Sequence, residues 1–412
     1  MAANVASAES PRARPPWLES LLGHGLALIA AFVIAIGVGS LIVVLYGESP
    51  LTVYGAILRF GFKDITSVGT ILSIATPLIF AALAVAICFK GGLFNIGVEG
   101  QFLIGMVTAS WAALQLEFLP GVLHLIAVLV FACLGGMVYA AIPGILKVTT
   151  GAHEVVTTIM MNGIAVSIVA YALNGPLKFT EAPPGQNVDL RTDIFEPSAL
   201  VPDLGHRFGV GGSAHLSWLL PIALLASVII WMVIRRMRLG YEARAVGSSV
   251  GSARAGGIAI GVVQVKLFLI SGALAGLVGM QQVLVERAAL VQNYEAQLGF
   301  TGIAVAFLGQ NNPIGIVFAA ILWAILSRGE TALQIDTDVP REFVIILQGI
   351  LIFCVVVVYQ VAKRRLARLQ LQRAGAEVGL RDTVAPEDVG PGDVAADDES
   401  AAGPPGHGTR SG

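Results

Sequence analysis

The sequence has little charge for its length. Only 13% of its 412 residues are Asp, Glu, Lys or Arg, whereas 56% are hydrophobic, and the mean hydropathy is +0.80. A typical soluble protein has about 25% charged residues, and a water-soluble chain of this length needs them to cover its surface. The composition excludes an ordinary soluble enzyme and predicts that lipid is the solvent for most of the surface.

Sequence patterns for catalysis, metal binding or nucleic-acid binding are also absent. There is no His-Glu-x-x-His zinc motif, no Gly-x-Ser-x-Gly nucleophile turn and no Gly-x-x-x-x-Gly-Lys-Ser/Thr phosphate loop. A membrane enzyme is therefore disfavoured, and the chain cannot hydrolyse ATP through a phosphate loop of its own. The three cysteines lie within apolar runs without Cys-x-x-Cys spacing, so we expect small packing residues rather than a metal site or disulfides. The sequence has no patch of basic and aromatic residues, so nothing in it indicates a nucleic-acid partner.

Long uncharged runs predict an all-α integral membrane protein. A helix needs about 20 apolar residues to cross the hydrocarbon core. Runs of about this length lie at residues 26–45, 67–89, 98–114, 122–146, 155–173, 216–234, 263–284 and 343–361. A further run, 300–326, is interrupted at residues 309–313 and divides into two pieces, each short for a complete span. Residues 49–64 are interpreted either as an amphipathic helix at the membrane interface or as a plain loop helix.

Basic residues in the short loops predict the orientation. Residues 235–266 and 363–373 each carry a net charge of +5, and the positive-inside rule places both in the cytosol. The acidic, proline-containing loop 174–215 is then extracytoplasmic. Six spans separate a cytosolic N-terminus from the cytosolic loop, so the interrupted run must enter and leave the membrane. This parity predicts about ten transmembrane or re-entrant helices.

Composition divides the chain into three parts. Residues 1–20 are predicted to form a cytosolic N-terminal tail, and residues 21–362 a transmembrane domain with a cytosolic loop at 235–262. Residues 363–412 form a cytosolic C-terminal tail that is first basic and then acidic and disordered.

The most informative polar segment, KGGLFNIGVEGQFLIGM at residues 90–106, places Asn95, Glu99 and Gln101 between two apolar runs. An ionisable side chain at membrane depth is costly and usually faces a cavity or a partner. One interpretation is that this segment is a broken helix that lines a polar pathway. The other is that Glu99 lies at the water interface and caps its own span, because a carboxylate suits the N-terminus of a helix.

A second polar set, Gln310, Asn311 and Asn312, lies at the interruption near the end of the chain. Amides donate and accept hydrogen bonds without charge, so they suit the hydroxyls of a sugar or the edge of a base. The alternative is a tight Asn-Pro turn whose amides bond to the backbone. Asn162 is a further candidate for the substrate pathway, although inter-helix hydrogen bonding is favoured for it and for Gln348.

The segment GYEARAVGSSVGSARAGGIAIG at residues 240–261 lies between two spans and is Ala-rich. Its positive charge is explained by topology alone. Its helix-forming composition, ended by Gly256 and Gly257, also predicts a short helix that docks on a cytosolic partner.

Three strings in this order carry a family resemblance: GLFNIGVEGQFLIG, GAHEVVTTIMMNGIA at residues 151–165, and EARAVGSSVGSARAGGIAIG. Over about residues 25–362 the chain resembles permease subunits of bacterial ABC importers of the branched-chain amino acid and simple sugar permease superfamily. Within it, the chain looks most like the nucleoside importer permeases, which work with substrate-binding lipoproteins of the basic membrane protein type.

The resemblance implies a type II-like importer permease fold of about ten helices. It further implies a second permease subunit, usually a different chain, cytosolic ATPase subunits that hold ATP and Mg, an extracytoplasmic lipoprotein, and no cofactor on this chain. The 240–257 loop is similar to the family's coupling segment, so the resemblance assigns ATPase coupling to Glu242, Arg244, Gly247, Arg254 and Gly257.

The expected function is thus uptake of nucleosides, or a similar neutral polar solute, across a bacterial cell membrane. Simple sugars such as ribose are an alternative substrate. A secondary transporter driven by H⁺ or Na⁺ through Glu99 is an alternative mechanism. A short internal similarity, between residues 95–101 and 294–299, is typical of duplicated transporter halves, although a match of this length also arises by chance.

Overall fold

The computed structural model describes residues 16–179, 190–336 and 342–358, together with Val361 and Arg365. The chain divides into two units, Met1–Gln360 and Val361–Gly412, and the fold below is that of the first. Most of the predicted tails, 1–20 and 363–412, lies outside the described residues, so both remain predictions.

The described part of the first unit is built from helices and the loops that connect them. Its only β-pairing is two isolated bridges, Arg191 with Val291 and Asp203 with Ser217. This confirms the all-α prediction. The α-helices are α1 (Pro16–Leu45), α2 (Pro50–Gly61), α3 (Ile65–Lys90), α4 (Val98–Gln115), α5 (Gly121–Thr150), α6 (Glu154–Asn174), α7 (Leu219–Arg236), α8 (Arg238–Ser248), α9 (Val250–Ala255), α10 (Ile260–Gly276), α11 (Leu298–Leu308), α12 (Pro313–Asp336) and an unlabelled helix, Glu342–Val358. Short helical turns are η1 (Pro197–Ala199), η2 (Gly205–Phe208), η3 (Gly212–Ala214) and the π-helical η4 (Gln282–Glu286).

Five of these helices are long and apolar enough to cross a membrane: α3, α5, α6, α7 and α12. Counting α1 and α2, which are bent by 114° relative to each other, as one broken span makes six. The shorter apolar helices α10, α11 and Glu342–Val358, together with the 18-residue α4, complete a set of ten among the described residues. The set matches the ten segments that the parity of the basic loops predicts.

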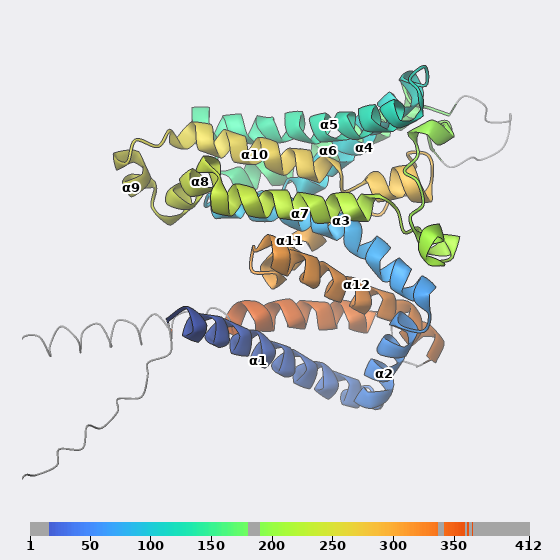
Figure 1. Cartoon of the computed structure of the whole chain (residues 1–412), viewed down its shortest axis with the longest axis vertical. Coiled ribbons are helices and arrows are strands. Elements are labelled where there is room, and N and C mark those ends of the chain that lie inside the picture. Colours follow the sequence, from blue (N-terminus) through green and yellow to red (C-terminus); the bar gives the residue numbers. More distant parts are fainter. Residues whose placement is uncertain (1–15, 180–189, 337–341, 359–360, 362–364, 366–412) are drawn as a thin grey trace, which may run out of the picture. The chain divides into compact units, whose positions relative to one another are not determined.

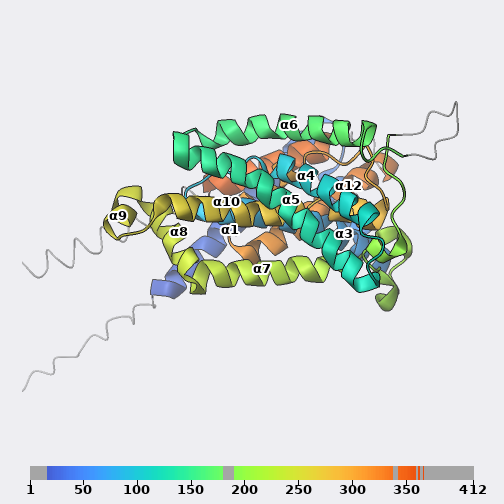
Figure 2. The same ribbon diagram turned by 90° about the horizontal axis from the view of Figure 1, so that it is seen from above.

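Helix α3 lies at the centre of the bundle (Figure 1) and contacts α7, α10, α11 and α12. It begins at Asp64, whose side chain accepts a hydrogen bond of 2.7 Å from the Ser67 nitrogen. In its most apolar stretch 89% of the residues are buried, whereas the shares in α5, α6 and α7 are 28% to 33%. Figure 2 shows α6 and α7 on opposite flanks of the bundle. Lipid is the natural solvent for the apolar side chains that these outer helices expose.

Glycines let the inner helices approach closely, as is common between membrane helices. Gly136 of α5 lies against Gly272 and Gly276 of α10, and Gly105 of α4 meets Gly276 from the other side. A methyl group at Gly276 would overlap the carbonyl oxygen of Ala132. Backbone contact of this kind holds α4, α5 and α10 together as one layer.

The interrupted run forms two helices, α11 and α12, with the predicted break between them. The prediction that both pieces are short is wrong for the second, because α12 has 24 residues. The hydropathy falls at Arg328 and Glu330, but the helix continues because protein rather than lipid surrounds these groups. The Arg328 guanidinium lies 4.8 Å from the ring centre of Phe60, and Glu330 lines a partly open cavity.

The amphipathic segment forms a helix, α2, whose buried face includes Val53, Ala56 and Ile57. This face packs against α12. A position of α2 at the membrane interface remains a prediction.

Candidate functional site

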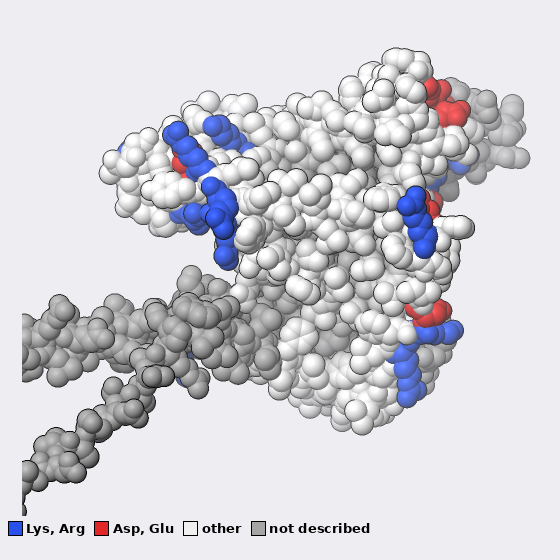
Figure 3. Space-filling model, in the orientation of Figure 1, with Lys and Arg blue, Asp and Glu red and all other residues white. Residues whose placement is uncertain are grey.

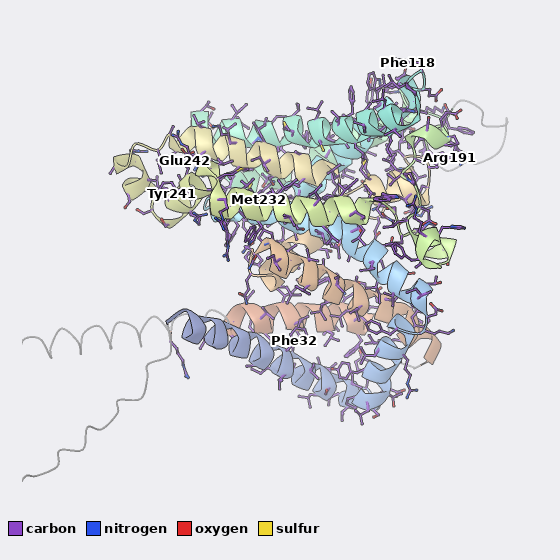
Figure 4. The ribbon with its side chains drawn as sticks, viewed as in Figure 1. Phe32, Phe118, Arg191, Met232, Tyr241 and Glu242 are labelled. Atoms are coloured by element: carbon purple, nitrogen blue, oxygen red, sulfur yellow. The ribbon has the colours of Figure 1, made fainter. Side chains whose placement is uncertain are left out.

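Lys and Arg side chains gather at the end of the bundle where α8 and α9 lie, which we call the α8 end (Figure 3). Residues 190–217 lie at the other end, which we call the loop end (Figure 1). Figure 4 shows Tyr241 and Glu242 at the α8 end and Arg191 and Phe118 at the loop end. The candidate residues fall into a polar core between helices, the α11–α12 turn, the α8 end and a cavity.

The polar core begins in the segment between α3 and α4, where Asn95 is 1% exposed. The Asn95 amide nitrogen donates to the Gln101 side chain at 2.9 Å and to the Ser271 hydroxyl at 2.9 Å. Its oxygen accepts from the Gly97 nitrogen at 3.0 Å and from the Gln101 amide at 3.0 Å. All of these partners belong to the chain itself, so the network positions the start of α4.

Asn162 of α6 holds the same helix start from the other side. Its side-chain oxygen accepts from the Gly100 nitrogen at 2.8 Å, and its amide nitrogen donates to the Ile96 carbonyl at 3.1 Å. This contact between helices agrees with the hydrogen-bonding role favoured for Asn162. Substrate contact by Asn95, Gln101 or Asn162 remains a prediction.

Glu99 is 6% exposed and caps a helix other than its own. One carboxylate oxygen accepts from the Gln297 nitrogen at 2.6 Å, and the other accepts from the Gly299 nitrogen at 2.9 Å. These N–H groups lie at the start of α11, where the backbone N–H groups have no acceptor within the helix. The two segments that are similar in sequence, 95–101 and 294–299, thus meet at this carboxylate. The starts of the short helices α4 and α11 converge there.

The turn between α11 and α12 holds Gln310 and Asn311 with left-handed backbones, at φ +57° and +52°. Asn312 accepts from the Ile314 nitrogen at 3.3 Å and so caps α12. This contact supports the interpretation as a tight Asn-Pro turn. Asn311 is buried, and its side-chain oxygen has no hydrogen-bond partner in the described chain. Sugar or base binding by the three amides remains a prediction.

Two of the predicted coupling residues on α8 contact their own chain. Glu242 pairs with Arg238 at 2.6 Å, and an Arg244 nitrogen donates to the Ile234 carbonyl at the end of α7. Arg254 is exposed on α9, and Gly257 follows that helix with φ +75°. Sequence reasoning missed Tyr241, which is 63% exposed on α8. An aromatic residue beside Glu242, in a segment bounded by Arg238 and Arg244, was the signal for an outward-facing docking side chain.

Gly247 connects α8 to the polar core. It packs on the backbone of Lys90 and Gly92, and a methyl group there would lie 3.0 Å from the Gly92 nitrogen and closer to the Lys90 carbonyl oxygen. Gly92 has a φ of +71°, which favours glycine. The last turn of α8 therefore touches the segment that carries Asn95 and leads to Glu99.

The structure also contains a cavity of about 580 Å³ between α3, the α10–α11 connection, α12 and the helix Glu342–Val358. Three carboxylates line it, those of Glu286, Glu295 and Glu330. Glu286 and Glu295 belong to the connection and lie outside the membrane-spanning helices. Partial loss of water raises the pKa of Glu295, and the same loss together with the nearby Glu295 charge raises the pKa of Glu286.

Sequence reasoning missed these cavity residues. The signal was present, since acidic and amide side chains cluster at residues 281–297 between two apolar runs. Gln281 and Gln282 build the wall: the Gln281 amide donates to Ser73 at 2.7 Å and to the His215 carbonyl at 2.8 Å. Gln282 in turn accepts from the Glu295 nitrogen at 2.8 Å. The His215 contact ties the cavity wall to the loop end.

Comparison with known proteins identifies the family. Residues 67–356 match the family described as branched-chain amino acid transport system, permease component. The chain belongs to this permease family. It is 35% identical over 86% of its length to the guanosine ABC transporter permease protein NupP of Bacillus subtilis, of which the match covers 99%. It is 31% identical over 81% of its length to the nucleoside ABC transporter permease protein NupB of Lactococcus lactis, of which 90% is covered.

A third relative carries a different substrate in its name. The chain is 29% identical over 83% of its length to the glucose ABC transporter permease protein TsgB13 of Haloferax volcanii, of which 88% is covered. All three relatives are ABC transporter permeases.

Family membership settles the class of protein. This ABC permease is a multi-pass membrane protein and a component of an ABC transport system, and not an enzyme. The predicted resemblance is confirmed. The ion-coupled alternative is not supported, because the relatives are ABC permeases and the Glu99 carboxylate is engaged by the backbone of α11.

Proposed function

We propose that this permease forms the membrane pathway of an importer for nucleosides. The observation that carries the proposal is the 35% identity to a guanosine permease along 99% of that relative. The nucleoside permease of Lactococcus lactis adds a second relative of the same substrate class. A neutral sugar is the second candidate, favoured by the 29% identity to the glucose permease.

The partner permease in this proposal is a second chain of different sequence. The relatives support this pairing. Lactococcus lactis has two nucleoside permeases similar to this chain, NupB and NupC, at 31% and 25% identity. Haloferax volcanii likewise has TsgB13 and TsgC13. Two similar but distinct permeases in one organism, named for one substrate class, fit a pair of unlike subunits.

The α8 end faces the cytosol in this proposal, and α8 and α9 dock on the ATPase subunit. The positive-inside rule supports the orientation, because this end carries the basic loop. Both chain termini are then cytosolic, and the loop end faces an extracytoplasmic substrate-binding lipoprotein. ATP and Mg bind to the partner ATPase, and this chain holds no cofactor of its own.

Energy from the ATPase reaches the pathway through packed backbone in this proposal. Movement of α8 acts through Gly247 on the segment that follows Lys90, and this segment positions Asn95 and the start of α4. Glu99 binds α4 to α11. Because α11 begins at the cavity wall, tilting of α8 changes the shape of the cavity.

Reconstitution of the complete importer tests the function. The chain, a second permease, an ATPase and a lipoprotein are placed in proteoliposomes, and uptake of radiolabelled guanosine and glucose is measured. We expect guanosine uptake that needs ATP and survives an ionophore. Uptake that persists without the ATPase, or uptake of glucose alone, contradicts the proposal.

A further inference from the structure

The cavity near the loop end has the size of a small-molecule site. Its volume is about 580 Å³, within the range of about 300–1,000 Å³ that is usual for such sites. Its walls come from five parts of the chain, which are α3, the α10–α11 connection, the start of α11, α12 and the helix Glu342–Val358. It lies directly beside the first turn of α11, where the Glu99 side chain accepts hydrogen bonds from the backbone.

The charge of the lining is of one sign. Glu286, Glu295 and Glu330 line the cavity, and none of the described lining residues is Lys, Arg or His. Arg287 and His215 lie near Glu286 without lining the cavity, so an anionic solute inside it would meet like charge on the lining itself. A solute with hydroxyl or N–H donors would find strong acceptors, since hydrogen bonds to a carboxylate exceed neutral ones in strength.

Two nearly buried side chains in the same lining each keep one polar atom that makes no hydrogen bond among the described residues. Trp323 is 9% exposed, and its indole N–H makes no hydrogen bond within the described chain. Gln348 is 6% exposed and donates to the Ser327 hydroxyl at 3.1 Å, while its amide oxygen makes no hydrogen bond among the described residues. Neither atom is among the fully buried unpaired atoms of the described residues, so both reach the open space of the cavity, where a solute that brings one acceptor and one donor can bind to them.

The carboxylates of the lining do not form a three-ligand metal cluster. Among the described residues no group of three or more His, Cys, Asp or Glu side chains lies close enough to hold a metal ion. The carboxylates are therefore spread around the cavity rather than gathered on a point. Spread acceptors suit an organic solute with several separated donors.

We propose that this cavity is a substrate-binding compartment of the permease that selects uncharged nucleosides and rejects their phosphorylated forms. Glu286 and Glu295 accept hydrogen bonds from the ribose hydroxyls, and Trp323 and Gln348 face the base. Repulsion from the carboxylates excludes a 5′-phosphate and equally the carboxylate of an amino acid. This inference rests on the proposed nucleoside function and adds a selective step inside the membrane subunit.

Thiol protection in the assembled importer tests the inference. Thr301 lines the cavity, and Thr301→Cys places a reactive thiol there. Its reaction with N-ethylmaleimide is followed with guanosine or guanosine 5′-monophosphate present, and labelling of the unsubstituted importer is subtracted. We expect guanosine to slow the reaction at least tenfold and the monophosphate to leave it unchanged. In the double variant Glu286→Gln with Glu295→Gln, half-protection needs at least tenfold more guanosine.

The control is Glu117→Gln, the same substitution at an exposed residue between α4 and α5. It leaves protection unchanged if the inference holds. Absence of protection by guanosine, equal protection by the monophosphate, or an equal loss in Glu117→Gln overturns the inference. Guanosine uptake by the unsubstituted importer separates the two proposals, because uptake without protection refutes only the cavity, whereas absence of uptake refutes the nucleoside function.

Discussion

Replacement of Glu99 by alanine removes the cap that joins α4 to α11. Two backbone N–H groups, that of Gln297 and the buried one of Gly299, lose their acceptor at 2.6 and 2.9 Å. A hydrogen bond to a charged group contributes about 1.5–3 kcal/mol, so the two bonds together contribute about 3–6 kcal/mol. Relief of the cost of burying a carboxylate offsets part of this loss, and we expect the free energy of unfolding to fall by about 3 kcal/mol.

Glu99→Gln separates the bonds from the packing. The amide keeps one oxygen for one N–H group but turns its own N–H₂ toward the other, so we expect about half the loss of Glu99→Ala. Unfolding of the purified chain is followed in mixed micelles with rising amounts of a denaturing detergent. The control Glu117→Gln, at an exposed site, should change the free energy of unfolding by less than about 0.5 kcal/mol. A loss below about 1 kcal/mol in Glu99→Ala would refute the capping role.

The remaining predictions concern backbone contact and helix caps. Gly247→Ala pushes α8 away from the segment after Lys90, so guanosine uptake should fall at least tenfold while ATP hydrolysis continues. The control is Gly251→Ala, whose methyl group would lie 4.0 Å from its nearest neighbour, and this variant should keep normal uptake. Gly276→Ala forces α10 from α5 and should lower the free energy of unfolding by about 1–3 kcal/mol, and an unchanged value would contradict the close packing. Asn162→Leu leaves the Gly100 nitrogen without its acceptor. The free energy of unfolding, measured in the same micelle titration, should fall by about 1–3 kcal/mol.

Much of the fold followed from the sequence because lipid imposes a simple rule on it. Apolar runs located the helices, and the parity of the basic loops required the interrupted run to form two segments, which became α11 and α12. The length of α12 was missed because Arg328 and Glu330 resemble the end of a span. Protein surrounds both groups, through Phe60 and the cavity, and hydropathy cannot distinguish a charge in protein from a charge in water.

The candidate site was foreseen only in part. Asn95, Glu99, Gln101 and Asn162 were selected as unusual polar residues within apolar sequence, and all four do make hydrogen bonds around the start of α4. Their partners were not foreseeable, because Glu99 acts on N–H groups of residues 297 and 299, some 200 positions later in the chain. The carboxylates of the cavity were passed over because they resemble an ordinary polar connection.

The sequence alone determined that most of the chain is embedded in lipid, which segments are apolar enough to form its helices, and which loops carry the positive charge. These properties depend on the transfer of each segment between water and hydrocarbon, which is local. The tertiary structure alone decided that two short helices start at one carboxylate, that a glycine of α8 touches the segment leading there, and that three distant glutamates share one cavity. Such contacts depend on how helices pack, and packing joins residues that the order of the chain keeps apart.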